Sequence, residues 1–105
     1  MMMPPAADRQ TEPRPPVAWC DGTIVPAASC LLPVGDAGFV LGATVTEQLR
    51  TFRGVPFLPG PHAARLEASL AALSIEPRWP TAEIFAAVAD VAARNHSCVA
   101  ADDDL

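Results

Sequence analysis

The chain has 105 residues and a formal net charge of −5; half of its residues are apolar, but only 6% are aromatic. This length predicts a single domain with a modest core. An acidic chain lacks the clustered Lys and Arg of nucleic-acid binding proteins. No apolar run approaches the ~20 residues of a membrane span, and the first residues lack the features of a signal peptide. We therefore expect a cytoplasmic protein whose partners include neither nucleic acid nor a membrane.

Cysteine and histidine placement argues against a metal site. Cys20, Cys30 and Cys98 are odd in number and form no Cys-x-x-Cys pair, which favours ordinary thiols over disulfides or zinc ligands. His62 and His96 are far apart in the sequence and have no ligand-like neighbours. We expect no metal.

The N-terminal part predicts a tail and then a hairpin. Residues 1–16 are rich in proline, alanine and charge, without apolar periodicity, and should be disordered. Val17–Cys20 and Thr23–Val25 then predict two strands joined at Asp21-Gly22, a dipeptide typical of a type I′ turn.

The middle of the chain predicts the longest strand. Asp36 begins an Asx-type turn, and residues 44–52 follow as a strand rich in β-branched and apolar residues. Alternation puts Thr46 and Gln48 on one polar face and Glu47 on the other. That polar face suits either solvent or a binding pocket. A tight turn at Arg53-Gly54 leads into a short strand over residues 55–58.

Two helices complete the prediction. The first begins at the prolines of residues 59–61 and ends near Leu73, with Leu66, Leu70 and Leu73 on its apolar stripe. His62, Arg65 and Ser69 lie beside that stripe, as on the polar edge of any amphipathic helix. The second helix begins after Thr81 as N-cap and ends near residue 95. The expected fold is therefore α+β, with a small antiparallel sheet of four to five strands and two helices packed on one side.

The ordered residues of this region resemble the class IV aminotransferases, which are pyridoxal-phosphate (PLP) enzymes of fold type IV. The family pattern is Asp-x-Gly-aromatic-x-x-Gly, a strand with Glu and Arg, Gly-x-x-Phe, and His-x-x-Arg-Leu with a nearby Ser. The matching positions in this chain are Asp36, Gly38, Phe39, Gly42, Glu47, Arg50, Gly54, Phe57, His62, Arg65, Leu66 and Ser69. The resemblance covers residues 19–95 and implies the small N-terminal domain of such an enzyme.

The resemblance implies a role for a few residues. Arg65 would bind the PLP phosphate, since a guanidinium is a permanently charged fork of donors. Thr46, Gln48 and Phe39 would border the substrate pocket, although Thr46 stands where the family often has Tyr or Phe. We assign no catalytic residue in this chain.

The chain contains no lysine, because all seven of its basic residues are arginine. PLP enzymes bind their cofactor covalently through a lysine. The resemblance therefore implies an N-terminal fragment, inactive alone, with residues 17–97 as the small domain and 98–105 as a truncated interdomain segment. The parent enzyme would be a homodimer with a C-terminal domain that supplies the lysine, acting on an amino acid and a 2-oxo acid. An aminodeoxychorismate lyase-like fragment and a non-catalytic interaction domain derived from this fold remain open alternatives.

Overall fold

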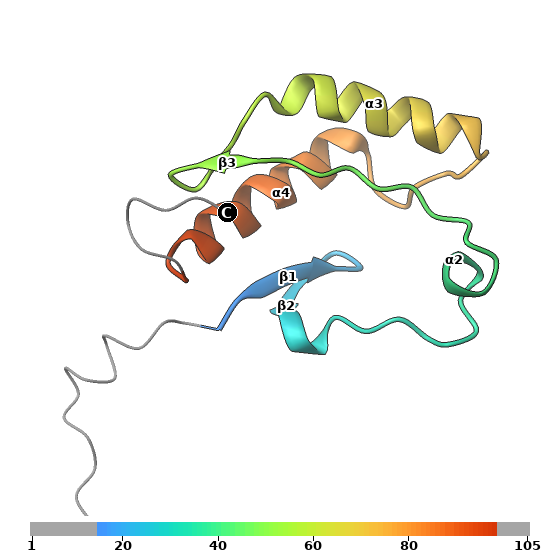
Figure 1. The fold of residues 1–105 in the computed structure, drawn as a ribbon, viewed down its shortest axis with the longest axis horizontal. Helices are drawn as coiled ribbons and strands as arrows, with labels where there is room; N and C mark the ends of the chain where they lie inside the picture. Colours follow the sequence, from blue (N-terminus) through green and yellow to red (C-terminus); the bar gives the residue numbers. More distant parts are fainter. Residues whose placement is uncertain (1–14, 99–105) are drawn as a thin grey trace, which may run out of the picture.

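The structure is a computed structural model that describes residues 15–98 and has an α+β fold (Figure 1). Within this range two antiparallel hairpins form separate two-stranded sheets. Helix α4 contacts both hairpins, and α3 contacts α4. The expected single sheet of four to five strands is therefore not formed. Residues 1–14 of the predicted tail (1–16) and residues 99–105 of the predicted interdomain segment (98–105) lie outside the described residues.

The first hairpin matches the sequence prediction closely. Strand β1 (Val17–Cys20) pairs with β2 (Thr23–Pro26), with Cys20 opposite Thr23. Asp21 and Gly22 both have positive φ, at 49° and 87°, as a type I′ turn requires. A single 3₁₀ turn, η1 (Ala27–Ser29), follows directly and packs against β1.

The long strand predicted over residues 44–52 is wrong in its extent. Only Thr51 and Phe52 form a strand, β3, which pairs with β4 (Val55–Pro56) across a turn at Arg53 and Gly54. A hydrogen bond of 2.8 Å from Phe57 N–H to the Arg50 carbonyl continues this hairpin by one step. The predicted alternation nevertheless holds, because odd-numbered residues from 45 to 51 are shielded and even-numbered residues are exposed.

Between the hairpins lies a short helix that the sequence analysis did not predict. It is α2 (Ala37–Val40), and Asp36 caps it by accepting a hydrogen bond of 2.9 Å from Gly38 N–H. The Asx-type turn predicted at Asp36 is thus confirmed, and a single helical turn is built on it.

Both long helices appear close to their predicted bounds. Helix α3 (Pro59–Ala72) has proline in its first turn, and α4 (Thr81–His96) follows a loop that contains Trp79. The prediction of Thr81 as N-cap is wrong, because Pro80 takes that position and the helix has no side-chain cap. Trp79 packs edge-on against Trp19, with ring centroids 4.9 Å apart, and so joins this loop to the first hairpin.

A two-way amide contact anchors the end of α4 on β1. The Asn95 side-chain oxygen accepts from Val17 N–H at 2.8 Å, and its NH₂ group donates to the Val17 carbonyl at 2.9 Å. The side chain of Asn95 therefore satisfies both backbone hydrogen-bonding groups of Val17, as the backbone of a neighbouring strand would.

The core is small. Leu70 of α3 and Ala92 of α4 are the buried apolar residues of the described region. Leu73, expected on the same apolar stripe, is 51% exposed and lies just after α3, which ends at Ala72. No helix of residues 15–98 has the length and hydropathy to span a bilayer.

Candidate functional site

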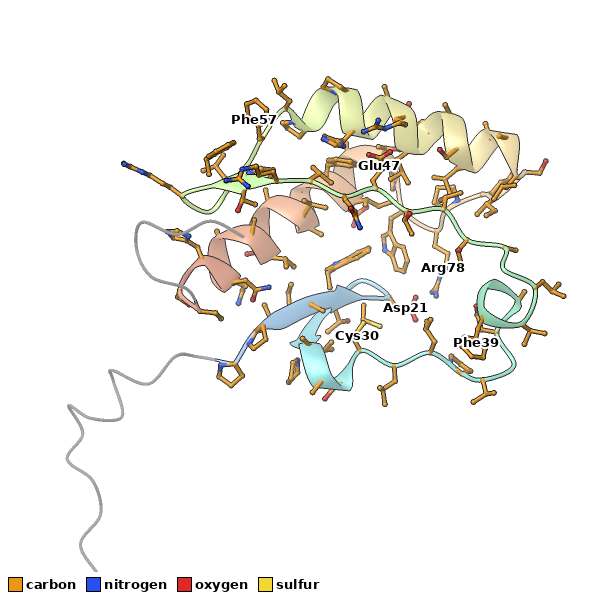
Figure 2. The ribbon with its side chains drawn as sticks, in the orientation of Figure 1. Asp21, Cys30, Phe39, Glu47, Phe57 and Arg78 are labelled. Carbon is orange, nitrogen blue, oxygen red and sulfur yellow. The ribbon has the colours of Figure 1, made fainter. Side chains whose placement is uncertain are left out.

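Three polar residues meet where the extended segment before β3 crosses α3. Glu47 lies on the shielded face of that segment, and His62 and Arg65 lie one turn apart on the first half of α3. Figure 2 shows Glu47 directed toward α3. We call these three residues the Glu47 cluster.

Glu47 accepts hydrogen bonds from both partners. Its Oε1 is 2.7 Å from Arg65 Nε, and its Oε2 is 3.2 Å from Arg65 Nη2. Oε2 is also 2.7 Å from His62 Nδ1. The Glu47 side chain is only 9% exposed, whereas that of Arg65 is 64% exposed. The carboxylate is therefore held inside the contact, and the guanidinium extends from it to the surface.

The short contact with Glu47 determines the tautomer of His62. A carboxylate can only accept, so Nδ1 must carry the hydrogen and donate it to Oε2. The Nη2 group of Arg65 also lies 3.1 Å from His62 Nδ1. Because His62 Nδ1 and Arg65 Nη2 both carry hydrogens, their contact is not a hydrogen bond. The two donors can lie this close because both donate to the carboxylate of Glu47.

These contacts hold the pKa of Glu47 below its ordinary value of 4.5. The hydrogen bond from His62 contributes most and that from Arg65 next, while partial burial opposes them. Glu47 is therefore ionised at neutral pH and bears the negative charge that positions Arg65.

Replacing Glu47 with glutamine should remove a pH-dependent part of the stability. A lowered pKa in the folded state stabilises the fold fully above the unfolded pKa, and this contribution is lost as the pH falls through the folded pKa. The difference in melting temperature between wild type and Glu47→Gln should thus be largest near about pH 7 and shrink below about pH 4.5. Thermal melts followed by circular dichroism would measure it.

The control for that measurement is the same substitution in a chain already lacking both partners. In a His62→Ala/Arg65→Ala background only the opposing effect of partial burial remains, so Glu47→Gln should no longer lower the melting temperature more near pH 7 than at acidic pH. A pH-dependent difference of equal size in both backgrounds would show that the cluster is not its cause.

A largely apolar hollow adjoins the Glu47 cluster. Its volume is about 370 Å³, and Glu47 is one of the residues that line it. One wall comes from β1, β4 and the segment entering β3, and the other from α4; the lining residues are Trp19, Glu47, Leu49, Thr51, Pro56, Ile84, Ala87, Val88, Val91 and Ala92. Of the cluster, only Glu47 lines this space, which lies between α4 and the strands.

The other residues expected at the site lie elsewhere. Thr46 and Gln48 are exposed on the face of the segment opposite to Glu47. Phe39 is 67% exposed in α2 and borders a different hollow of about 330 Å³ together with Leu31 and Pro33. Figure 2 shows Phe39 well away from Glu47. The described residues therefore bring Arg65 to Glu47 and His62, and leave Phe39 outside that cluster.

The sequence pattern indicates Arg65 but not the residues that position it. His62 and Arg65 have i, i+3 spacing, which indicates a shared helix face. Glu47 is the common partner of His62 and Arg65. The only sign of this in the sequence is that alternation places Glu47 on the shielded face of its segment. Among residues 15–98 no group of three His, Cys, Asp or Glu side chains is arranged to hold a metal ion.

Comparison of the chain with protein-family models, with curated proteins and with solved structures finds no match.

Proposed function

We propose that this chain is the small domain of a PLP-dependent enzyme of the class IV aminotransferase kind, and that Arg65 contacts the phosphate of the cofactor. The enzyme would move an amino group between an amino acid and a 2-oxo acid. The observation that carries the proposal is the Glu47 cluster, in which a nearly buried carboxylate fixes an exposed arginine.

The donors of Arg65 fit a phosphate. A guanidinium has five N–H bonds, and Glu47 takes one at Nε and one at Nη2. The remaining donors belong to a side chain that is 64% exposed, so an anion can approach the Nη1 side while Glu47 holds the other edge. Fixing the fork in advance lowers the entropy lost when the anion binds.

The residues of this chain fit only that part of the cofactor. PLP, when bound, supplies an electron sink for reactions at the α-carbon of an amino acid. Its covalent attachment needs a lysine, and the chain has none. In this proposal Arg65 binds and orients the phosphate, and a second domain supplies the lysine.

Exposed apolar side chains support the presence of such a second domain. The described residues include a group of large hydrophobic side chains that are 45–79% exposed: Leu31, Leu32, Val34, Phe39, Val40, Leu41, Phe52, Val55, Phe57, Leu58 and Leu73. Six of these eleven lie between residues 31 and 41. Large apolar side chains left exposed in one segment are typical of a surface that packs against a partner. We propose that the lysine-bearing domain covers part of it and that the complete enzyme is a cytoplasmic homodimer.

The same partner would complete the sheet. Residues 45–51 keep the alternation of a strand but pair only near β3. The hollow beside Glu47 separates this segment from Trp19 of β1. We propose that packing against the second domain closes this space and joins both hairpins and the segment into one sheet of four to five strands.

A second candidate function is a non-catalytic interaction domain. The missing lysine and the exposed apolar residues between positions 31 and 41 favour it, because both are expected of a domain that binds a partner without performing the chemistry. Cofactor binding after fusion to a lysine-bearing domain distinguishes the two candidates.

The proposal predicts that the chain alone forms no covalent adduct with PLP. After incubation with PLP and reduction by borohydride, intact mass and peptide mapping should show no phosphopyridoxyl group on any side chain, and transaminase assays no turnover. Modification of the terminal amine does not bear on this prediction. Fusing the chain ahead of a class IV C-terminal domain should restore PLP binding and slow amide hydrogen exchange over residues 45–49.

Each half of this experiment can fail separately. A side-chain adduct or turnover in the chain alone would refute the need for a second domain. A fused protein that folds but binds no PLP would instead favour the interaction domain.

A further inference from the structure

The Glu47 cluster leaves one ring nitrogen of His62 open. Nδ1 donates to Glu47 at 2.7 Å, so Nε2 lies across the imidazole ring and faces away from the carboxylate. In the described part of the chain, His96 Nδ1 is the only buried side-chain nitrogen or oxygen without a hydrogen-bond partner. Nε2 of His62 has no partner among residues 15–98 and is not such a buried atom, so it reaches the surface of a side chain that is 19% exposed.

This open nitrogen lies beside the guanidinium of Arg65. Arg65 Nη2 is 3.1 Å from His62 Nδ1, and Nε2 is only the width of one five-membered ring away from Nδ1. Glu47 accepts one hydrogen from Nε and one from Nη2 of Arg65. The other guanidinium hydrogens and Nε2 of His62 are therefore neighbours that the carboxylate does not occupy. A tetrahedral anion has several oxygens and can accept from two such groups at once.

The charges of the cluster favour a proton on Nε2 when such an anion binds. Glu47 and Arg65 offset each other, so the cluster has no net charge while His62 is neutral, and the whole chain has a formal charge of −5. A neutral Nε2 also presents a lone pair, which repels an anion oxygen, whereas a protonated Nε2 donates a hydrogen bond. Uptake of one proton thus replaces a repulsive contact with a charge-assisted hydrogen bond.

We propose that His62 is a second phosphate-binding residue of this chain and that it takes up a proton at Nε2 when the phosphate binds. The proton comes from solvent, and Nδ1 keeps its hydrogen bond to Glu47, so that the imidazolium donates from both nitrogens. This inference rests on the proposed contact of Arg65 with a phosphate, and it adds a second donor and a dependence on pH. The ligand class is a tetrahedral dianion, such as a phosphate monoester.

His62 is the member of the cluster that can change its charge near neutral pH. A histidine does so between about pH 5 and 8. Glu47 on the segment before β3 and Arg65 on α3 are the charged side chains of residues 15–98 within hydrogen-bonding distance of His62. Arg65 stays protonated, and the pKa of Glu47 lies below 4.5, so both keep their charges over this range. Affinity for the dianion should therefore fall on the order of tenfold from about pH 5 to pH 8.

The test is an NMR titration of the complete chain with sulfate at several values from about pH 5 to pH 8, at constant ionic strength in sodium chloride. Sulfate is doubly charged throughout this range, so any proton taken up is bound by the protein. Near neutral pH, sulfate should move the ¹⁵N signal of His62 Nε2 toward that of an imidazolium. His96, the other histidine of the chain, is the internal control, and its ring signals should stay unchanged.

Two variants separate the roles of His62 and Arg65. His62→Asn retains an amide donor for Glu47 but has no nitrogen that gains a proton in this range. It should bind sulfate more weakly than wild type at pH 5, with an affinity that no longer changes up to pH 8. Arg65→Ala should lose on the order of tenfold in affinity at every pH. Amide spectra of both variants would verify that they are folded.

The outcomes distinguish this inference from the proposed function. A wild-type affinity that is constant from pH 5 to pH 8, or a pH dependence that persists in His62→Asn, would overturn the role of His62 and leave the Arg65 contact standing. If Arg65→Ala binds as wild type while His62→Asn does not, the contact proposed for Arg65 is refuted and that of His62 remains. Folded wild-type chain that binds no sulfate at any pH would overturn the inference outright.

Discussion

Replacing Leu70 with alanine should destabilise this domain by about 2–5 kcal/mol, the range observed for deleting a buried leucine side chain. Leu70 lies on α3 and is 9% exposed, and Ala92 on α4 is the other buried apolar residue of the described region. Urea denaturation followed by circular dichroism would measure the loss.

Leu73 provides the matched control. It has the same side chain and follows Leu70 by three residues, but it is 51% exposed at the C-terminal end of α3. Leu73→Ala should therefore change the free energy of unfolding by no more than about 0.5–1 kcal/mol. Equal losses from both substitutions would mean that the core is not centred on Leu70.

A loss of this size is large for a domain with so small a core. Folded proteins of this length are stable by only about 5–15 kcal/mol, and small chains fall at the lower end. The largest side chains of the described region include many that are exposed, Phe39 and Leu41 among them. We therefore expect Leu70→Ala to be mostly unfolded at temperatures where wild type is folded, unless a partner domain adds its own contacts.

Features that depend on a few adjacent residues could be predicted from the sequence. Asp21-Gly22 specifies positive φ at both turn positions, and the structure has them. The bounds of α3 follow from its prolines and from its apolar period. Such signals are local, so they do not depend on which surfaces the rest of the chain provides.

The length of the central strand could not be predicted in this way. Residues 44–50 have the composition and alternation of a strand, but a strand also needs a neighbour with free backbone groups. Here the neighbours are a short hairpin and an apolar hollow. The composition of residues 44–50 therefore indicates an extended segment, but it does not show which strand, if any, pairs with that segment.

Contacts between distant residues were also beyond the sequence pattern. Glu47 is 15 residues from His62 and 18 from Arg65, and Asn95 is 78 residues from Val17. Side-chain type marks such residues as capable of bonding, but only the packing of the elements selects their partners.

Arg65→Ala should weaken PLP binding roughly tenfold to a hundredfold in a protein that joins this chain to a class IV C-terminal domain. If Arg65 contacts the cofactor phosphate as proposed, the substitution deletes charge-assisted hydrogen bonds that contribute about 1.5–3 kcal/mol. Arg65→Lys should restore only part of the affinity, because an ammonium keeps the charge without the planar fork. Titration of the fused proteins with PLP, followed by absorbance, would give the dissociation constants.

Two further variants separate a phosphate contact from a structural link. Arg94 is also an exposed arginine, whose Nε donates to Asp90 at 2.9 Å, so Arg94→Ala should leave PLP affinity unchanged. Glu47→Gln weakens the hold on Arg65 but keeps its guanidinium, and should cost less affinity than Arg65→Ala. If Glu47→Gln and Arg65→Ala lost affinity equally, Arg65 would act only through Glu47. If Arg65→Ala lost none, the cofactor contact proposed for this chain would be refuted.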